Sequence, residues 1–212
     1  MNNLIRERKG MLILSLLVIL LPMGVGLFLW NQLPDQVPIH FGLNGQADNY
    51  AGKAFVVFGL PLLMAALQVL LLVVTMADPK GKNIADKPFG LLLWICPLVS
   101  LFCGTMTYAK ALALPVDINL VGGLFLGLMF LVVGNYLPKC KQTYTVGIRL
   151  PWTLADEDNW AYTHRLAGKV WTIGGLVILA LTFLRLPVLQ FFVILVLVLI
   201  PTAASFLYAR RR

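Results

Sequence analysis

Charge is scarce in this sequence. Only 12% of its 212 residues are charged, whereas 59% are hydrophobic, and the mean hydropathy is +0.85. A soluble domain carries about 25% charged residues and is roughly half apolar. The composition therefore excludes an ordinary soluble domain and indicates a polytopic membrane protein.

Cysteine and histidine are also rare, with three and two residues. Cys96 and Cys103 share one face of a predicted helix at a seven-residue interval, so they cannot bridge each other and no disulfide framework is expected. His40 has Asp35 and Asp48 nearby, but zinc usually takes three or four protein ligands and this segment has no cysteine. We therefore expect no metal ion and no cofactor.

Recognisable catalytic motifs are missing. His164 lies beside Arg165, yet no serine or cysteine stands in a nucleophile elbow, and neither H-E-x-x-H nor G-x-S-x-G occurs. A catalytic histidine needs such a nucleophile or a carboxylate held within reach. We predict that the protein is not an enzyme.

Long hydrophobic runs dominate what remains. About 20 apolar residues cross a bilayer, and inside lipid such runs must be helices because the backbone has to pair within its own segment. The candidate spans are Met11–Trp30, Ala54–Ala77, Phe89–Tyr108, Ile118–Tyr136, Val170–Leu184 and Val188–Tyr208. They predict an all-α fold: a polytopic bundle of six transmembrane helices that forms a single membrane domain over residues 1–212. The fifth run is short, and we expect its helix to begin near Leu166.

Lys and Arg are distributed unevenly between the two ends of the spans. The N-terminus, the second and fourth connections and the C-terminus hold 14 of them, from Arg6 to Arg212, against 3 on the other side (Lys53, Lys110 and Arg185). The positive-inside rule therefore places both termini in the cytoplasm. Topology thus accounts for the net charge of +8, so direct binding of nucleic acid is not expected.

The first connection, residues 31–53, is predicted to face outward. Its composition, with Pro34, Pro38, Gly42, Gly45 and Gly52, is typical of structured turns, and we expect neither a strand nor a long helix. His40 and Asp48 are expected to hydrogen-bond backbone groups across these turns. Such a rigid loop suits recognition of an extracellular partner.

The fourth connection, residues 134–169, is a polar, aromatic island in a hydrophobic chain, and it is predicted to be cytoplasmic. Tyr136 and Pro138 are expected to end the fourth helix at the membrane surface. Residues 144–150 are predicted to be extended or looped. A helix start is expected at Pro151, with Thr153 and Asp156 spaced as a capping box.

Within the island, a stripe formed by Trp160, His164, Ala167 and Trp171 falls on one helical face. Two interpretations remain open: an anchor that lies along the membrane surface before the chain turns inward near Gly168, or a docking surface for a protein. Arg149 and Trp152 are read either as contacts with lipid headgroups and the membrane interface or as contacts with a repressor or within the island's own fold. Arg149 is also a candidate to pair with Asp156 or Glu157.

Both connections resemble known family motifs. The outer loop, LPDQVPIHFGLNGQADNYAGK, is similar to the Pro-x-x-x-Pro-x-His pattern of the DUF1648 family. Its candidate recognition residues are Pro38, His40, Phe41, Gly45, Asp48, Tyr50 and Lys53. The island is similar to the C-terminal signature of the SdpI family, which usually has Thr at the position of Leu150. Its candidate docking or structural residues are Asn135, Pro138, Lys139, Gly147, Arg149, Pro151, Trp152, Thr153, Trp160, His164 and Arg165.

The resemblance implies a bacterial immunity protein in the cytoplasmic membrane. The family's namesake protects a producer cell from its own secreted killing peptide, and it also retains a cytoplasmic transcriptional repressor at the membrane. The implied partners are membrane lipid, a secreted toxin peptide and an ArsR-like repressor; the sequence does not specify an oligomeric state. The rival hypothesis is a transporter of a peptide or lipid, but ion-coupled transporters usually carry ionisable groups within their spans. In this sequence, Gln68 and Asn135 are the most polar side chains within the predicted spans.

Overall fold

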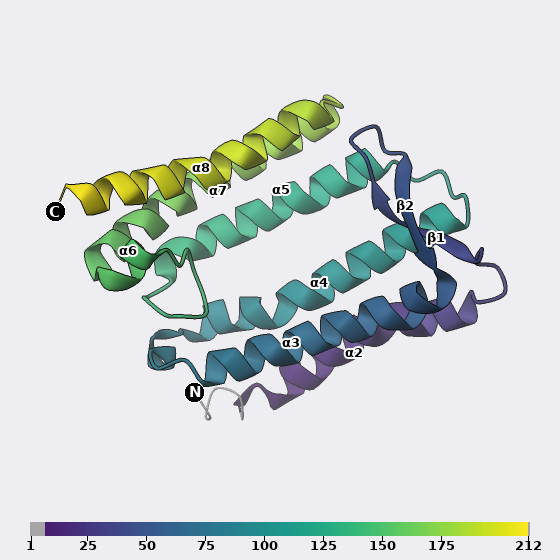
Figure 1. The fold of residues 1–212 in the computed structure, drawn as a ribbon, viewed down its shortest axis with the longest axis horizontal. Helices are drawn as coiled ribbons and strands as arrows, with labels where there is room; N and C mark the ends of the chain where they lie inside the picture. The colour runs from purple at the N-terminus through teal and green to yellow at the C-terminus, as the bar shows by residue number, and fades with distance from the viewer. Residues whose placement is uncertain (1–6, 212) are drawn as a thin grey trace. The chain divides into compact units, whose positions relative to one another are not determined.

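The computed structural model describes residues 7–211 and is mostly helical (Figure 1). Within that range, six helices are long and apolar enough to cross a membrane, as predicted, so the chain is a multi-pass membrane protein. They are α2 (Lys9–Phe28), the π-helical turn Phe55–Gly59 that continues into α3 (Leu60–Met76), α4 (Asp86–Ala111), α5 (Ile118–Tyr136), α7 (Glu157–Phe183) and α8 (Pro187–Arg210). A short helix, α6 (Pro151–Ala155), precedes α7. Arg6 and Arg212, which contribute to the predicted charge asymmetry, lie outside the described residues.

The fold is mostly helical as predicted, but the expectation that residues 31–53 contain no strand is wrong. Strands β1 (Gln36–Phe41) and β2 (Ala47–Gly52) form an antiparallel hairpin, with register shifts on both sides of His40. Both strands are edges of a two-stranded sheet, and an edge tolerates a residue such as Pro38 that lacks an N–H group. The predicted turn is present at the tip, where Gly45 has a φ of 74°. The prolines and glycines of this segment obscured the alternation of inward and outward side chains in the flanking strands.

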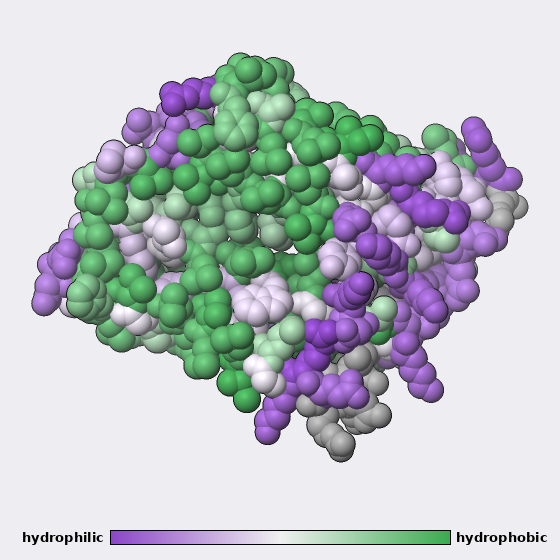
Figure 2. All heavy atoms as spheres, turned by 180° about the vertical axis from the view of Figure 1, so that it is seen from behind, coloured by the Kyte–Doolittle hydropathy of each residue, from purple (hydrophilic) through white to green (hydrophobic). Residues whose placement is uncertain are grey.

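The long helices expose apolar side chains and bury polar ones. Leu17, Leu63 and Leu199 are each at least 60% exposed. Hydrophobic residues make up most of the face in Figure 2, and hydrophilic residues gather towards its edges. Small polar side chains are buried in the spans: Ser15, Gln68, Ser100, Thr107, Thr182, Gln190 and Ser205. This arrangement suits a lipid environment, in which buried polar groups bond helices together.

The chain forms two compact units. The first comprises Met1–Val73 and Phe89–Ile118 and includes α2, the hairpin, most of α3 and most of α4. Within it the Ser100 hydroxyl donates to the carbonyl of Ile19 at 2.9 Å, and the Tyr108 hydroxyl donates to the carbonyl of Pro22 at 2.9 Å. These two bonds tie α4 to α2. Gly26 permits this approach, because a Cβ there would lie 2.4 Å from the Tyr108 hydroxyl.

The second unit comprises Val74–Pro88 and Asn119–Arg212. In it, α5 and α7 pack closely through glycines: a Cβ on Gly127 would lie 3.1 Å from the Gly175 carbonyl, and one on Gly134 would lie 3.1 Å from the Gly168 carbonyl. Small residues let helices in lipid approach in this way. The Trp171 indole donates to the carbonyl of Leu197 at 2.8 Å, which joins α7 to α8.

The fifth span differs from its prediction. Helix α7 begins at Glu157 and continues without a break through Gly168, so the predicted start near Leu166 is wrong by about two and a half turns. Helix α5 ends at Tyr136, as predicted, and a single 3-10 turn, Leu137–Lys139, follows it. The polar first turns of α7 lacked a hydrophobic signal, which is why the sequence did not reveal them as part of a long helix.

Candidate functional site

The hairpin has one inward and one outward face. Val37 is fully buried and belongs to an apolar cluster with Val56, Val57 and Tyr108. Ile39 and Ala51 pack against the same cluster. Because side chains alternate along a strand, the intervening side chains point the other way.

The outward face carries three of the predicted recognition residues. Tyr50 is 53% exposed, and the side chains of His40 and Asp48 are 68% and 51% exposed. The His40 Nδ1 atom lies 2.5 Å from the Asp48 Oδ1 atom, so these side chains bond to each other across the strands and not to the backbone as predicted. This pair presents a polar edge beside an aromatic ring.

The other four predicted hairpin residues serve the fold. Pro38 is buried, and Phe41 and Gly45 are half-buried. The Lys53 ammonium group lies 3.4 Å from the Asp35 carboxylate and 5.0 Å from the centre of the Trp30 ring. Lys53 therefore fastens the base of the hairpin, and the surface available to a partner is narrower than the motif.

In the island, Thr153 organises the start of α6. Its Oγ1 atom accepts from the N–H of Leu150 at 2.9 Å and lies 2.9 Å from the carbonyls of Ile148 and Leu150, to which its hydroxyl donates. The side chain is fully buried. The predicted capping box is wrong, because Asp156 caps α7 instead: its carboxylate accepts from the N–H groups of Asp158 and Asn159.

Trp160 and His164 form the inner wall of the island. Their rings stack with centroids 4.0 Å apart, and the two residues are 2% and 1% exposed. The His164 Nε2 atom accepts from the N–H of Ile148 at 2.9 Å, and Nδ1 lies 2.8 Å from the Trp160 carbonyl. These partners assign the neutral tautomer with hydrogen on Nδ1. The Trp160 indole donates to the carbonyl of Cys140 at 2.8 Å.

The stripe that contains these rings is therefore not an interfacial anchor or a docking surface, and both predictions for it are corrected. Trp160 and His164 face the island's own loop, where their buried ring nitrogens bond to backbone groups, whereas the half-buried Trp171 joins α7 to α8. Gly147 (φ 123°) crosses directly over the two rings: a Cβ at this position would lie 2.5 Å from His164 Nε2 and 2.7 Å from the Trp160 ring.

The linker between α3 and α4, residues 77–85, is bonded to the island and was missed by sequence reasoning. The Asp78 carboxylate, 9% exposed as a residue, accepts from the N–H of Tyr144 and the hydroxyl of Thr145, each at 2.8 Å. It also accepts from the N–H of Lys80 at 2.8 Å. Three donors on one carboxylate make Asp78 the main fastening of the linker to the island.

Gln142 completes this junction. Its side-chain oxygen accepts from the Lys80 ammonium group, and its carbonyl accepts from the Asn83 amide at 2.8 Å. Its own amide donates to the carbonyls of Thr153 and Leu154 at 2.9 and 3.0 Å. One sequence signal was present: the linker carries polar residues of the right chemistry, but nothing in their order indicated a partner over 60 residues away.

The island is also tied to α8. The Trp152 indole donates to the Ser205 hydroxyl at 2.9 Å, and the Asn159 amide donates to the Ser205 carbonyl at 3.1 Å. The Thr163 hydroxyl donates to Asn159 Oδ1 at 3.0 Å. Trp152 is half-buried, so its indole contributes to packing as well as to the surface.

The predicted island residues thus divide into two groups. Thr153, Trp160 and His164 are buried. The exposed members are Asn135, Pro138, Lys139, Arg149, Pro151 and Arg165. The Arg149 guanidinium donates to the carbonyl of Tyr144 at 2.9 Å, and the Glu157 carboxylate lies 3.7 Å from Lys80. Arg149 therefore braces its own loop, and the predicted pairing with Glu157 is wrong.

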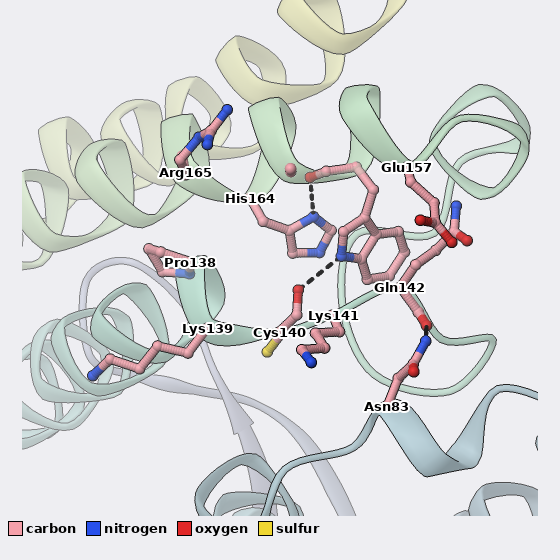
Figure 3. A pocket seen from close by; sticks show the side chains of 11 residues that line it. Asn83, Pro138, Lys139, Cys140, Lys141, Gln142, Glu157, His164 and Arg165 are labelled. Carbon is pink, nitrogen blue, oxygen red and sulfur yellow. Dashed lines mark hydrogen bonds between the residues drawn. The ribbon is translucent and has the colours of Figure 1, made fainter.

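An open pocket of about 600 Å³ lies against the wall of Trp160 and His164 (Figure 3). Figure 3 shows Lys139 and Lys141 on the side of the loop and Arg165 on α7. The residues that line the pocket are Asn83, Pro138, Lys139, Cys140, Lys141, Gln142, Glu157, Trp160, Ala161, His164 and Arg165.

Burial raises the pKa of the Cys140 thiol. Over residues 7–211, no group of three or more His, Cys, Asp or Glu side chains is placed to hold a metal ion.

Comparison with known proteins agrees with both motifs. The model of the SdpI/YfhL protein family matches residues 139–209, and the domain of unknown function DUF1648 matches residues 17–65. Over about a third of its length the chain is thus similar to the SdpI/YfhL family. It is 26% identical over 206 residues to Immunity protein SdpI of Bacillus subtilis (strain 168), a match that covers 94% of this chain and 96% of the relative. That homologue is an immunity protein and not an enzyme. No solved structure matches the chain.

Proposed function

We propose that this chain is an immunity protein of the bacterial cytoplasmic membrane that protects its cell against a secreted, membrane-active killing peptide. The observation that carries the proposal is the similarity to an immunity protein along nearly the whole chain, which includes both motifs. Six apolar spans support a location in the membrane on which such a peptide acts.

The surface that would meet the peptide is the outward face of the hairpin. His40, Asp48 and Tyr50 are exposed there, while the opposite face is fixed against the helices by Val37. An aromatic ring beside a polar pair suits a peptide with apolar and polar side chains, and a preformed surface loses little conformational freedom on binding.

The membrane orientation in this proposal places the hairpin outside and the island in the cytoplasm, following the asymmetry of Lys and Arg. Six spans put the first and fourth connections on opposite sides. The hydrogen bonds between the linker and the island support one part of this arrangement, since they require the second and fourth connections to share a side.

Labelling of single cysteines with a membrane-impermeant maleimide in intact cells tests this orientation. A Gln46→Cys variant at the hairpin tip should react, and a Lys82→Cys variant in the linker should react after the membrane is opened. Labelling in the reverse order would refute the orientation.

Protection itself is tested by expressing the protein in a sensitive bacterium and challenging it with the killing peptide encoded beside its gene. Wild type should confer resistance, and Tyr50→Ala should reduce it at equal membrane abundance. Lys82→Ala, an exposed change in the linker, serves as the matched control. A well-expressed wild-type chain that gives no protection would refute the proposal.

We also infer a second role, retention of a cytoplasmic transcriptional repressor of the ArsR-like class by the island. The available surface is formed by the exposed residues Arg149 and Pro151 with the half-buried Trp152. Co-purification of the repressor with wild type, its loss with Arg149→Ala and its persistence with Lys82→Ala would support docking there. Persistence with Arg149→Ala would leave the island with a structural role.

The transport hypothesis has no observation in its favour. Two polar side chains of the spans are engaged in joining helices: the Gln68 amide donates to the carbonyl of Leu93 at 3.4 Å, and the Gln190 amide donates to the Thr182 hydroxyl at 2.7 Å. Substrate-dependent flux into vesicles that contain the purified protein would revive it.

A further inference from the structure

Two pockets of different character adjoin at the end of α5. The first is the polar pocket beside Trp160 and His164 described above. The second, of about 330 Å³, is lined by Pro138, Tyr162, Arg165, Leu166 and Lys169. Pro138 and Arg165 line both pockets, so a ligand with one polar and one apolar part could occupy the two together.

The basic side chains around these pockets lack protein counter-ions. The side chains of Lys141, Arg165 and Lys169 make no hydrogen bond or ion pair with any other residue in the range 7–211, and the Lys139 ammonium group lies 5.0 Å over the Tyr136 ring. The nearby acidic residue, Glu157, has its carboxylate 3.7 Å from Lys80. The lining therefore carries excess positive charge that an anionic ligand would neutralise.

The wall of the polar pocket offers few free polar atoms. Both ring nitrogens of His164 and the indole nitrogen of Trp160 already bond to the backbone. Recognition of a ligand would thus depend on the charged side chains, and a phosphate group is the ligand chemistry that lysine and arginine bind best.

The second pocket is bounded by apolar groups: the Pro138 ring, the Leu166 side chain and the Tyr162 ring. The aliphatic stems of Arg165 and Lys169 add to its walls while their charged ends reach water. It lies just beyond the end of α5 and beside the first turns of α7, and the ends of membrane-spanning helices are where lipid headgroups are met.

We propose that these adjoining pockets form a binding site for an anionic phospholipid. Its phosphate lies among Lys139, Lys141 and Arg165, and one acyl chain follows Pro138 and Leu166 towards the bilayer core. Basic pockets on membrane helices bind anionic headgroups through this combination of charge and apolar contact. Binding of lipid at this site does not require a toxin or a repressor. The lipid proposal can therefore be tested independently of the immunity function.

Native mass spectrometry of the purified full chain tests the proposal, with phosphatidylglycerol and phosphatidylcholine added in turn. The wild-type protein should retain phosphatidylglycerol in preference to phosphatidylcholine. Each loss of a basic group near the surface should weaken binding about fivefold, so Lys141→Gln with Arg165→Gln should weaken it about 25-fold. Lys82→Gln removes the same charge from an exposed position that lines neither pocket, and it should leave the preference unchanged.

Two further measurements make the outcome decisive. Thermal unfolding in phosphatidylcholine should show equal midpoints for wild type and the double variant, which separates lost binding from lost folding. Glycerol 3-phosphate at millimolar concentration should not displace the lipid; displacement would identify a site for soluble phosphate compounds and overturn the lipid assignment. A preference that survives the double substitution, or that falls equally with Lys82→Gln, would also overturn it.

Discussion

The hairpin and the island both carry family motifs, but their motif residues are used differently. In the hairpin, the side chains of His40 and Asp48 bond to each other and remain exposed, and the Tyr50 side chain is exposed as well. In the island, Thr153 and His164 are buried and hold the backbone of the loop. A family motif can thus mark a surface in one region and an internal framework in another, and burial distinguishes the two.

The largest expected contrast comes from two glycines with positive φ. Gly147→Ala should lower the free energy of unfolding by about 2–5 kcal/mol, because a strained backbone is combined with a clash against two buried rings. Gly45→Ala at the hairpin tip should cost roughly 1 kcal/mol for its left-handed backbone. Thermal unfolding in detergent measures both changes, and equal effects would remove the contrast between the two regions.

The next contrast compares two aspartates. Asp78→Asn replaces a carboxylate oxygen, which accepts hydrogen bonds, by an amide NH2 group, which is itself a donor. It should lower the free energy of unfolding by about 1–3 kcal/mol. Asp48→Asn affects a pair that is largely exposed, which is worth about 0–1 kcal/mol. Limited proteolysis of the island loop should accelerate with Asp78→Asn alone; acceleration with Asp48→Asn would contradict the assignment of Asp78 as the fastening.

A smaller contrast concerns two tryptophans. Trp152→Phe keeps an aromatic ring but removes the indole N–H that donates to Ser205, so a loss of about 1 kcal/mol is expected. Trp30→Phe, beside the hairpin, keeps a ring that lies near Phe58 and Lys53 and should cost a few tenths of a kcal/mol, about the difference between the two rings in binding a cation. The Ser205 hydroxyl still donates to the carbonyl of Thr202, so restoration by Ser205→Ala in the Trp152→Phe background would identify the unsatisfied acceptor position of its oxygen as the cause.

The smallest effect is kinetic and concerns thiol reactivity. Burial raises the pKa of Cys140, so at pH 7 its thiolate fraction is below that of an ordinary cysteine, and its labelling should quicken as the pH rises through a higher range than usual. The reference is a Gln46→Cys variant at the exposed hairpin tip, with Cys96 and Cys103 replaced by Ala in both chains. Equal labelling rates at pH 7 would show that the island loop opens readily.

Much of the fold could be predicted from local sequence. The end of α5 at Tyr136 and the start of α6 at Pro151 follow from proline and the hydrophobic run. The hairpin was missed because its prolines and glycines suggested turns, whereas Val37 and Ile39 form an inward face that becomes apparent once the helices beneath them are known. The early start of α7 at Glu157 was missed because its first residues, Glu157, Asp158 and Asn159, are polar and give no hydrophobic signal.

Hydrophobicity and charge along the chain determined by themselves that this protein spans a membrane with six helices, because lipid selects long apolar helices whatever their neighbours are. Tertiary structure alone decided which motif residues are surfaces and which are framework. The Asp78 carboxylate meets Tyr144 and Thr145, and Trp152 meets Ser205, across more than 50 residues of chain. Hydrogen bonds of this kind depend on distances and directions in space, and a residue's neighbours in sequence do not specify them.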